Sequence, residues 1–285
     1  MTMTAEGCLI CRETGSKEFL SQGDFSYLRC ERCGLVYLHP QPDFGCLRDL
    51  YAGNAQCTVD TGIDPTGEEI IYRSRFTGEL DRIEKLRSPG RILDIGSAWG
   101  FFLALARERG WKTWGVELSR EASGYARSRF GLDVFTGKLA EARLPENHFD
   151  TVTLWHVLEH IPDPLAELAE IRRIIKNDGL LVISVPTPWS ASEYSSDAIP
   201  LHLFYFDKAT LTTLARKAGF SVVRIEGRSS SGVMSKLKKA GIRDPRGIVV
   251  RHWRVLSKLR KLLHSMTKHL GHPREITLYA VPSDR

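Results

Sequence analysis

The sequence predicts an α/β fold in which a mainly parallel sheet is covered by helices on both faces. From about residue 91 onward, short apolar runs alternate with stretches of helical amphipathic spacing, which is typical of this architecture. The 285 residues are 42% hydrophobic and 26% charged, the balance of a globular protein. No apolar run approaches the roughly 20 residues that a membrane-spanning helix needs.

The expected elements follow one another along this part of the chain. Apolar runs predict strands over residues 92–95, 113–116, 134–136, 151–155, 180–185 and 221–225. Capping residues predict three helices: one from Ser119 to Gly131, one from Asp163 to residues 177–179, and one from Asp207 to Gly219.

The chain is expected to have three parts. Residues 1–43 hold two cysteine pairs and predict a small zinc-ribbon module. Residues 44–89 contain several prolines and glycines and predict a connector, with one helix over residues 68–86 that we expect to act as a lid. Residues 90–285 carry the α/β domain, interrupted by a basic insertion over about 229–274.

The two cysteine pairs predict a zinc site. Cys8 and Cys11 are followed after 18 residues by Cys30 and Cys33, a spacing at which two knuckles place four thiolates around one zinc ion. Because these four ligands complete a tetrahedron, the zinc is expected to be structural. The alternative is four unrelated buried thiols.

The net positive charge comes from one part of the chain. The net charge is +6, yet residues 229–274 contain 12 Lys and Arg against one acid, so this segment carries +11 and the rest about −5. Nucleic-acid-binding proteins usually spread positive charge over a binding face, so nucleic acid is not an expected partner. The first residues lack the basic and apolar regions of a secretory signal, which predicts a cytoplasmic location.

Residues 92–103 carry the strongest functional signal. A strand leads through a turn containing Gly96 and Gly100 into a helix, where the backbone can approach a nucleotide-like ligand. Glu117 ends the next strand, where a carboxylate can accept hydrogen bonds from both hydroxyls of a ribose. An adenosine cofactor is therefore expected, and a dinucleotide is disfavoured because the bulky Phe101 occupies the sixth motif position.

The missing pyrophosphate-binding pattern favours S-adenosylmethionine, whose sulfonium tolerates aromatic faces nearby. Trp99, Phe101 and Trp155 supply such faces. A role in the hydrophobic core is at least equally compatible with each of them.

Several motifs point to one family. They are LDIG at 93–96, GVELS at 115–119, FDTVTLWHVLEHI at 149–161, GLLVISVP at 179–186 and HLFYF at 202–206. Together, over most of residues 72–281, they resemble the class I S-adenosylmethionine-dependent methyltransferases. The two-knuckle module resembles the zinc ribbon that precedes many bacterial small-molecule and sugar methyltransferases. The resemblance implies a Rossmann-like seven-stranded sheet with helices on both faces and a final antiparallel strand over residues 276–281.

The resemblance also implies which residues bind the cofactor. Gly96 and Gly100 would line its methionine part and Glu117 would hold the ribose. The further positions are Asp94, Ser97 and Leu118 within the same motifs, Lys138 and Leu139 beside the adenine, and Trp155 and His156 facing the sulfonium.

Two histidines are candidates for catalysis. Methyl transfer depends mostly on alignment, and a base is needed only for a weakly acidic acceptor. For a hydroxyl acceptor, a neutral histidine is the natural base near pH 7, and His156 and His202 are the candidates. Either can instead be a packing or hydrogen-bonding residue, and His160 is expected to be structural.

The basic insertion predicts an amphipathic helix with an apolar stripe and many Lys and Arg. We expect the stripe to pack on the core or in a homodimer. The alternative is peripheral contact with an anionic membrane or a lipid-linked substrate.

The expected function is that of an S-adenosylmethionine-dependent methyltransferase (EC 2.1.1.-) that methylates oxygen on a small-molecule or glycan acceptor. The alternatives are an RNA methyltransferase and a non-catalytic cofactor-binding or scaffolding protein.

Overall fold

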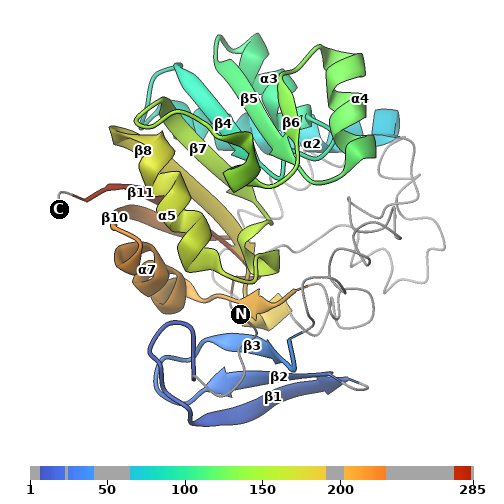
Figure 1. Ribbon diagram of the computed structural model, residues 1–285. Helices are drawn as coiled ribbons and strands as arrows, with labels where there is room; N and C mark the ends of the chain where they lie inside the picture. Colours follow the sequence, from blue (N-terminus) through green and yellow to red (C-terminus); the bar gives the residue numbers. More distant parts are fainter. Residues whose placement is uncertain (1–6, 23–24, 42–64, 191–201, 229–272, 284–285) are drawn as a thin grey trace, which may run out of the picture.

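The computed structural model describes residues 7–22, 25–41, 65–190, 202–228 and 273–283. In this part of the chain, a seven-stranded sheet carries helices on both faces, and a four-stranded sheet lies beside it (Figure 1). The predictions for the basic insertion concern residues that lie, except for the last two, outside the described ranges.

The large sheet has the strand order β10-β11-β8-β7-β4-β5-β6. Its strands are β4 (Arg91–Ile95), β5 (Lys112–Glu117), β6 (Val134–Thr136), β7 (Phe149–Trp155), β8 (Ile175–Pro186), β10 (Phe220–Arg228) and β11 (Glu275–Pro282). The five strands from β6 to β8 are parallel, and β11 runs antiparallel between β8 and β10. The expected fold and the final antiparallel strand are confirmed.

Alternating side chains build a core on each face of this sheet. In β8, Leu181, Ile183 and Val185 join one cluster of buried residues, whereas Leu180 and Val182 join the other. A strand buried on both faces is apolar at nearly every position, as expected for a parallel sheet between two helical layers.

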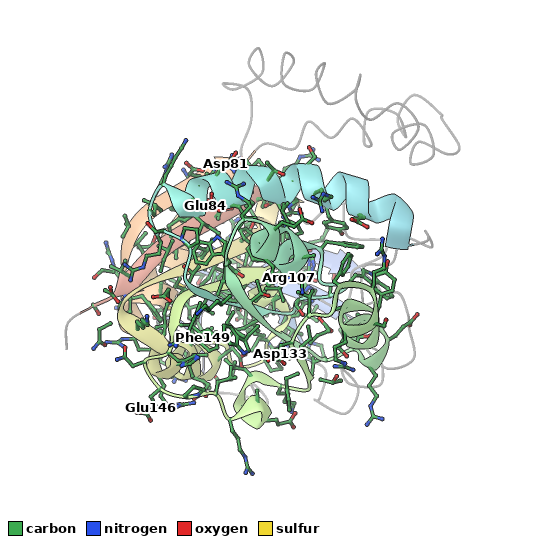
Figure 2. The ribbon with its side chains drawn as sticks, turned by 90° about the horizontal axis from the view of Figure 1, so that it is seen from above. Asp81, Glu84, Arg107, Asp133, Glu146 and Phe149 are labelled. Atoms are coloured by element: carbon green, nitrogen blue, oxygen red, sulfur yellow. The ribbon has the colours of Figure 1, made fainter. Side chains whose placement is uncertain are left out.

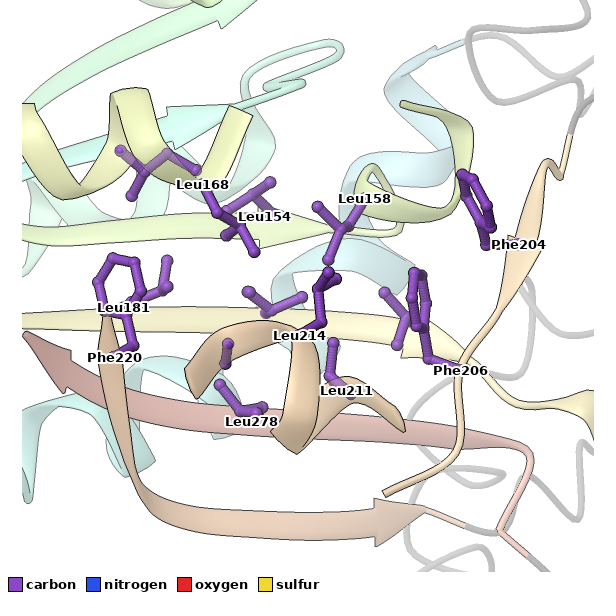
Figure 3. Close-up of a cluster of buried hydrophobic side chains, with 14 of the residues drawn as sticks. Leu154, Leu158, Leu168, Leu181, Phe204, Phe206, Leu211, Leu214, Phe220 and Leu278 are labelled. Carbon is purple, nitrogen blue, oxygen red and sulfur yellow. The ribbon is translucent and has the colours of Figure 1, made fainter. Parts of the chain in front are cut away.

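The helices divide between the two faces. Their bounds are α2 (Pro65–Glu84), α3 (Phe101–Glu108), α4 (Arg120–Phe130), α5 (Pro164–Ile174) and α7 (Lys208–Lys217), with short 3-10 turns η2 (Leu139–Ala142), η3 (Leu158–His160) and η4 (Pro188–Ser190). Leu168 of α5 and Leu214 of α7 reach the face that carries Leu154, Leu181 and Leu278 (Figure 3). Helices α2 and α3 cover the opposite face.

The helix starts expected from the sequence are confirmed. Ser119 accepts a hydrogen bond from the amide of Ala122, and Asp163 and Asp207 cap α5 and α7 in the same way. Gly131 ends α4 in the left-handed conformation, with φ of +61°.

One helix end was placed wrongly. The helix that begins after Asp163 ends at Ile174, not at residues 177–179, because the chain enters β8 at once. Ile175 pairs with Phe149 of β7, and both side chains are buried. Pairing with the sheet therefore replaces the last helical turn that the glycine at 179 suggested.

Helix α2 lies alongside α3 and is part of a helical layer (Figure 2). Its residues Phe76, Leu80 and Ile83 are buried in the core on that face. The guanidinium of Arg109 joins the two helices because it contacts the carboxylates of both Asp81, at 2.8 Å, and Glu84. Whether the helix also serves as a lid stays a prediction.

The small sheet links the N-terminal module to the large domain. Strands β1 (Ser16–Gln22), β2 (Phe25–Cys30) and β3 (Val36–His39) form an antiparallel meander, and β9 (Phe204–Tyr205) joins it beside β3. The amide of Leu38 donates to the carbonyl of Leu203, whose own amide donates to the carbonyl of Glu159 in η3. The module is therefore hydrogen-bonded to the segment that follows β7. Among the described helices, none is long and apolar enough to cross a membrane.

Candidate functional site

The candidate site lies at the carboxyl ends of the parallel strands, where ligands bind in sheets of this kind. The loop between β4 and α3 there adopts left-handed backbone conformations, with φ of +69° at Gly96, +46° at Ala98 and +80° at Gly100. The amide of Gly96 donates to the carbonyl of Val116 at 2.8 Å. This bond ties the loop to the end of β5.

Close packing explains the two glycines of the loop. A Cβ at Gly96 would lie 2.4 Å from a methyl group of Val157, in the segment after β7. At Gly100 it would lie 2.7 Å from Leu132 and 2.8 Å from Ala126. The absence of a side chain at Gly96 thus lets the loop approach the segment after β7. At Gly100 it lets α3 approach α4.

The carboxylate of Glu117 joins the loop to β5. Its Oε2 accepts the amide of Ala98 at 2.8 Å and its Oε1 accepts the amide of Ser119 at 2.8 Å. The residue is only 8% exposed, and this burial raises the pKa of the carboxyl. Each oxygen retains acceptor capacity for a further donor, so a ribose diol can still be bound there.

Three other predicted cofactor residues lie in this region. Asp94 is 2% exposed within β4 and accepts a hydrogen bond of 2.6 Å from the hydroxyl of Thr153. Burial raises its pKa to about 8, so Asp94 is a protonated residue beneath the loop at neutral pH. The hydroxyl of Ser97 is buried and has no hydrogen-bond partner within the described ranges. Leu118, in contrast, is 54% exposed.

Lys138 and Leu139, the pair predicted to border the adenine, differ in the exposure of their side chains. Lys138 is exposed at the start of η2, where its amide donates to Glu141 at 2.8 Å. The side chain of Leu139 is buried in a core cluster. Lys138 is therefore the member of this pair with an exposed side chain.

The three candidate aromatic residues divide between core and surface. Phe101 and Trp155 are buried, and the ring of Trp155 lies 5.2 Å from that of Phe102 and 5.7 Å from that of Phe76. The core role therefore holds for both. The indole nitrogen of Trp155 is buried without a hydrogen-bond partner among the described residues. Trp99 is only partly buried, against Tyr125.

His156, directly after β7, lies between two carboxylates. Its Nδ1 is 3.4 Å from Glu159 and its Nε2 is 3.4 Å from Glu275. Burial lowers the pKa of the imidazole, but the two carboxylates outweigh this and raise it to about 9. His156 is therefore an imidazolium near pH 7. The expectation that His156 acts as a neutral base stays a prediction, and it requires the ring to lose this proton first.

Glu275, at the start of β11, was not among the predicted site residues. This carboxylate accepts hydrogen bonds from Arg75 at 3.0 Å and from the hydroxyl of Ser184 at 2.7 Å. Burial raises its pKa, but the positive charges of Arg75, His156 and Arg228 hold it well below its usual range. No local motif marks this residue, because its partners come from distant parts of the sequence.

His202 lies near Glu159, with a ring nitrogen within 4.8 Å of a carboxylate oxygen. Its Nδ1 is 3.1 Å from the hydroxyl of Tyr205, and its ring lies 4.7 Å from that of His160. Burial, together with the nearby histidines, lowers its pKa to about 3. His202 is therefore neutral but accepts a proton poorly. The structure brings both candidate bases to Glu159 and gives neither of them a pKa near 7.

The four predicted zinc ligands come together in the N-terminal module. The sulfurs of Cys8 and Cys33 are 3.4 Å apart, those of Cys11 and Cys30 are 3.5 Å apart, and all four lie within 4.8 Å of one another. Each knuckle closes with a residue of positive φ, Arg12 or Gly34. This geometry can hold a metal ion.

Comparison with known proteins identifies the family. The family model described as "Methyltransferase domain" matches residues 70–225. A protein of Mycolicibacterium smegmatis named a probable S-adenosylmethionine-dependent methyltransferase is 28% identical over 139 residues, covering 48% of this chain and 54% of that protein. A ubiquinone biosynthesis O-methyltransferase of Neisseria meningitidis is 27% identical over 159 residues, covering 48% and 66%. The chain thus spans about half the length of the first curated relatives it matches.

Solved structures show the same fold. An S-adenosylmethionine-dependent methyltransferase of Archaeoglobus fulgidus superposes with a TM-score of 0.55 at 19% identity, over 84% of this chain and 100% of that one. A phosphoethanolamine N-methyltransferase of Haemonchus contortus also gives 0.55 at 19% identity, over 74% and 53%. At such low identity these likenesses establish the fold alone.

Proposed function

Since this chain belongs to the methyltransferase domain family, we propose that it transfers the methyl group of S-adenosylmethionine to a hydroxyl oxygen of a small molecule or glycan. The observation that carries the proposal is the carboxylate of Glu117, which joins the glycine loop to the end of β5 through the amides of Ala98 and Ser119. The relatives named ubiquinone biosynthesis O-methyltransferase support an oxygen acceptor.

The residues present fit the cofactor. The hydroxyl of Ser97 is a buried donor with no partner in the described part of the chain, and Glu117 has acceptor capacity for two ribose hydroxyls. The exposed side chain of Leu118 can cover an adenine ring. When bound, the cofactor supplies the methyl group as an electrophile on a sulfonium leaving group.

The chain's own contribution is binding, alignment and exclusion of water. His156 lies 3.4 Å from both Glu159 and Glu275 beside the end of β7, so we assign it a positioning role. The low pKa of His202 makes this residue a weak base in the resting protein.

We propose that the N-terminal module binds one structural zinc ion through Cys8, Cys11, Cys30 and Cys33. Thiolates at about 2.3 Å from one zinc ion are roughly 3.8 Å from each other, close to the 3.4 and 3.5 Å seen for the two closest sulfur pairs. Two of the four thiols are buried, which favours a role in folding.

The test combines binding and turnover. Calorimetry with S-adenosylhomocysteine should show one site per chain, and S-adenosylhomocysteine should form from S-adenosylmethionine when a panel of hydroxylated small molecules and glycans is supplied. Binding without turnover on any acceptor would indicate a cofactor-binding protein instead. Turnover on RNA alone would move the substrate class to nucleic acid, and absence of binding would contradict the proposal as a whole.

A further inference from the structure

A second group of metal-ligating side chains lies outside the cysteine module. Glu159, His160 and His202 each offer one ligand atom, and these atoms lie within 4.8 Å of one another. We call these three residues the Glu159 cluster. Glu159 and His160 belong to η3, directly after β7, and His202 comes shortly before β9. The cluster therefore stands at the carboxyl edge of the sheet, next to His156.

The carboxylate of Glu159 has an unusual environment. The residue is 0% exposed, and neither of its oxygens has a hydrogen-bond partner in the described ranges. The nearest ring nitrogens are Nδ1 of His156 at 3.4 Å and Nε2 of His160 at 3.9 Å. A buried carboxylate is costly unless a cation or several hydrogen bonds compensate its charge. His156 compensates part of this charge without a hydrogen bond to it, so a bound cation would stabilise the carboxylate further.

His202 is held as a metal-binding histidine is held. A ligating imidazole usually makes a hydrogen bond through its second nitrogen, which fixes the tautomer and the direction of the ring. Nδ1 of His202 lies 3.1 Å from the hydroxyl of Tyr205, a contact that fixes the direction of the ring. The backbone carbonyl of His202 accepts a hydrogen bond of 2.8 Å from Tyr27, which fixes the main chain as well.

We propose that the Glu159 cluster binds a divalent transition-metal ion such as Mn²⁺, Fe²⁺ or Zn²⁺. Two imidazoles and one carboxylate suit these ions and leave coordination positions open for another ligand. Ligands bonded at about 2.0–2.2 Å to one ion lie roughly 3 to 3.5 Å apart, so side-chain torsions need to close the cluster by at most about 1.3 to 1.8 Å. His156 then orients Glu159 from outside the ligand set.

The role of this ion rests on the proposed function. A hydroxyl of the acceptor occupies an open position, and the ion lowers its pKa, so that its proton passes to water. The oxygen then forms its bond to the methyl carbon as the carbon–sulfur bond of the cofactor breaks.

The test measures metal binding by the full-length protein loaded with one equivalent of zinc, which the four cysteines take up first. Mn²⁺ is the probe because thiolates prefer softer ions, so the cysteine site does not take it up. Electron paramagnetic resonance of free Mn²⁺ should show one bound ion per chain. Glu159→Gln and His202→Ala should weaken binding by more than about tenfold, whereas Glu121→Gln on the exposed face of α4 should leave it unchanged.

Folding is checked by thermal unfolding and by S-adenosylhomocysteine binding. His160→Asn gives a second test, because the side chain of His160 is partly exposed and tolerates substitution better than Glu159. Absence of bound Mn²⁺ in the wild type, or undiminished binding in folded variants of the cluster, would overturn the proposal. Methyl transfer without bound metal would overturn the catalytic role of the ion and leave the proposed function intact. Bound metal without transfer to any acceptor would leave the metal site intact and contradict the proposed function.

Discussion

The hydroxyl of Tyr27 donates a hydrogen bond of 2.8 Å to the backbone carbonyl of His202, 175 positions later in the chain. Tyr27 lies in β2 of the N-terminal module, and its ring packs edge-on against Tyr205, which itself contacts Nδ1 of His202. The module therefore buttresses a residue of the candidate site. The N-terminal module, whose four cysteines could hold a metal ion, thus has a direct structural route to that site.

We expect Tyr27→Phe to loosen His202 without unfolding the protein. The loss of one buried hydrogen bond should lower the free energy of unfolding by about 0.5 to 1.5 kcal/mol. It should also weaken Mn²⁺ binding, because His202 loses a contact that fixes its backbone. Tyr37→Phe in β3 removes a hydroxyl from the same module and is the control. Equal effects of the two variants on Mn²⁺ binding would argue against a positioning role for Tyr27.

Zinc removal is expected to loosen the N-terminal module. Elemental analysis of freshly purified wild-type protein should find one zinc ion per chain, and Cys30→Ser should lose it. The N-terminal module should become sensitive to proteolysis at temperatures where the large sheet stays folded, because the metal supports the module alone. Full zinc occupancy in the Cys30→Ser protein would show that these cysteines do not hold the ion.

The contacts of Glu117 predict a loss of cofactor affinity on substitution. In Glu117→Gln the side-chain amide can replace only one of the two acceptor oxygens that face Ala98 and Ser119. Charge-assisted hydrogen bonds to a ribose are also lost, so S-adenosylhomocysteine should bind more weakly by about 1.5 to 3 kcal/mol, roughly 10- to 150-fold. Calorimetry checks this, with Glu121→Gln as the control. Unchanged affinity in a folded Glu117→Gln protein would remove Glu117 from the cofactor site.

The sheet could be predicted from the sequence because its signals are local. An apolar run such as Leu180–Val182 predicts a strand, and a capping residue such as Ser119 predicts a helix start, from neighbouring residues alone. The helix after Asp163 was extended too far because its end depends on the pairing of Ile175 with Phe149. Such a contact overrides the local helix signals. A short stretch of neighbouring residues does not reveal it.

The site could be predicted only in part, for the same reason. The glycine loop and Glu117 belong to contiguous motifs and are placed together at the edge of the sheet. The charge state of His156 depends on Glu275, which β11 brings from the end of the described chain. The spacing of His156, Glu159 and His160 directly after a strand was the signal that could have indicated a cluster, but His202 joins it only through the fold.

The burial of Asp94 predicts a pH dependence of stability. Its pKa is raised from an ordinary value near 4 to about 8 by burial and by the charge of Glu117. Above pH 4 the unfolded state therefore releases a proton that the folded state keeps. The free energy of unfolding should fall as pH rises towards 8, by up to about 1.4 kcal/mol per unit. Asp94→Asn, which can still accept the hydrogen bond from Thr153, should lack this component. Identical pH profiles from chemical denaturation of the two proteins between pH 5 and 8 would contradict the assignment.

The packing of Gly96 gives the last prediction, which separates backbone strain from steric contact. Gly96→Ala places a methyl group at φ of +69°, where an L-residue is strained by about 1 to 2 kcal/mol, and sets it 2.4 Å from Val157. The clash should add about 1 to 3 kcal/mol, because Val157 belongs to the segment that joins β7 to η3. Gly131→Ala is the matched control, since Gly131 has φ of +61° but no atom within 4 Å of the added methyl group. Thermal unfolding should therefore show a larger loss for Gly96→Ala, and S-adenosylhomocysteine affinity should fall only in that variant. Equal losses would mean that the loop is not held against β7, and the close approach that defines the cofactor site would be wrong.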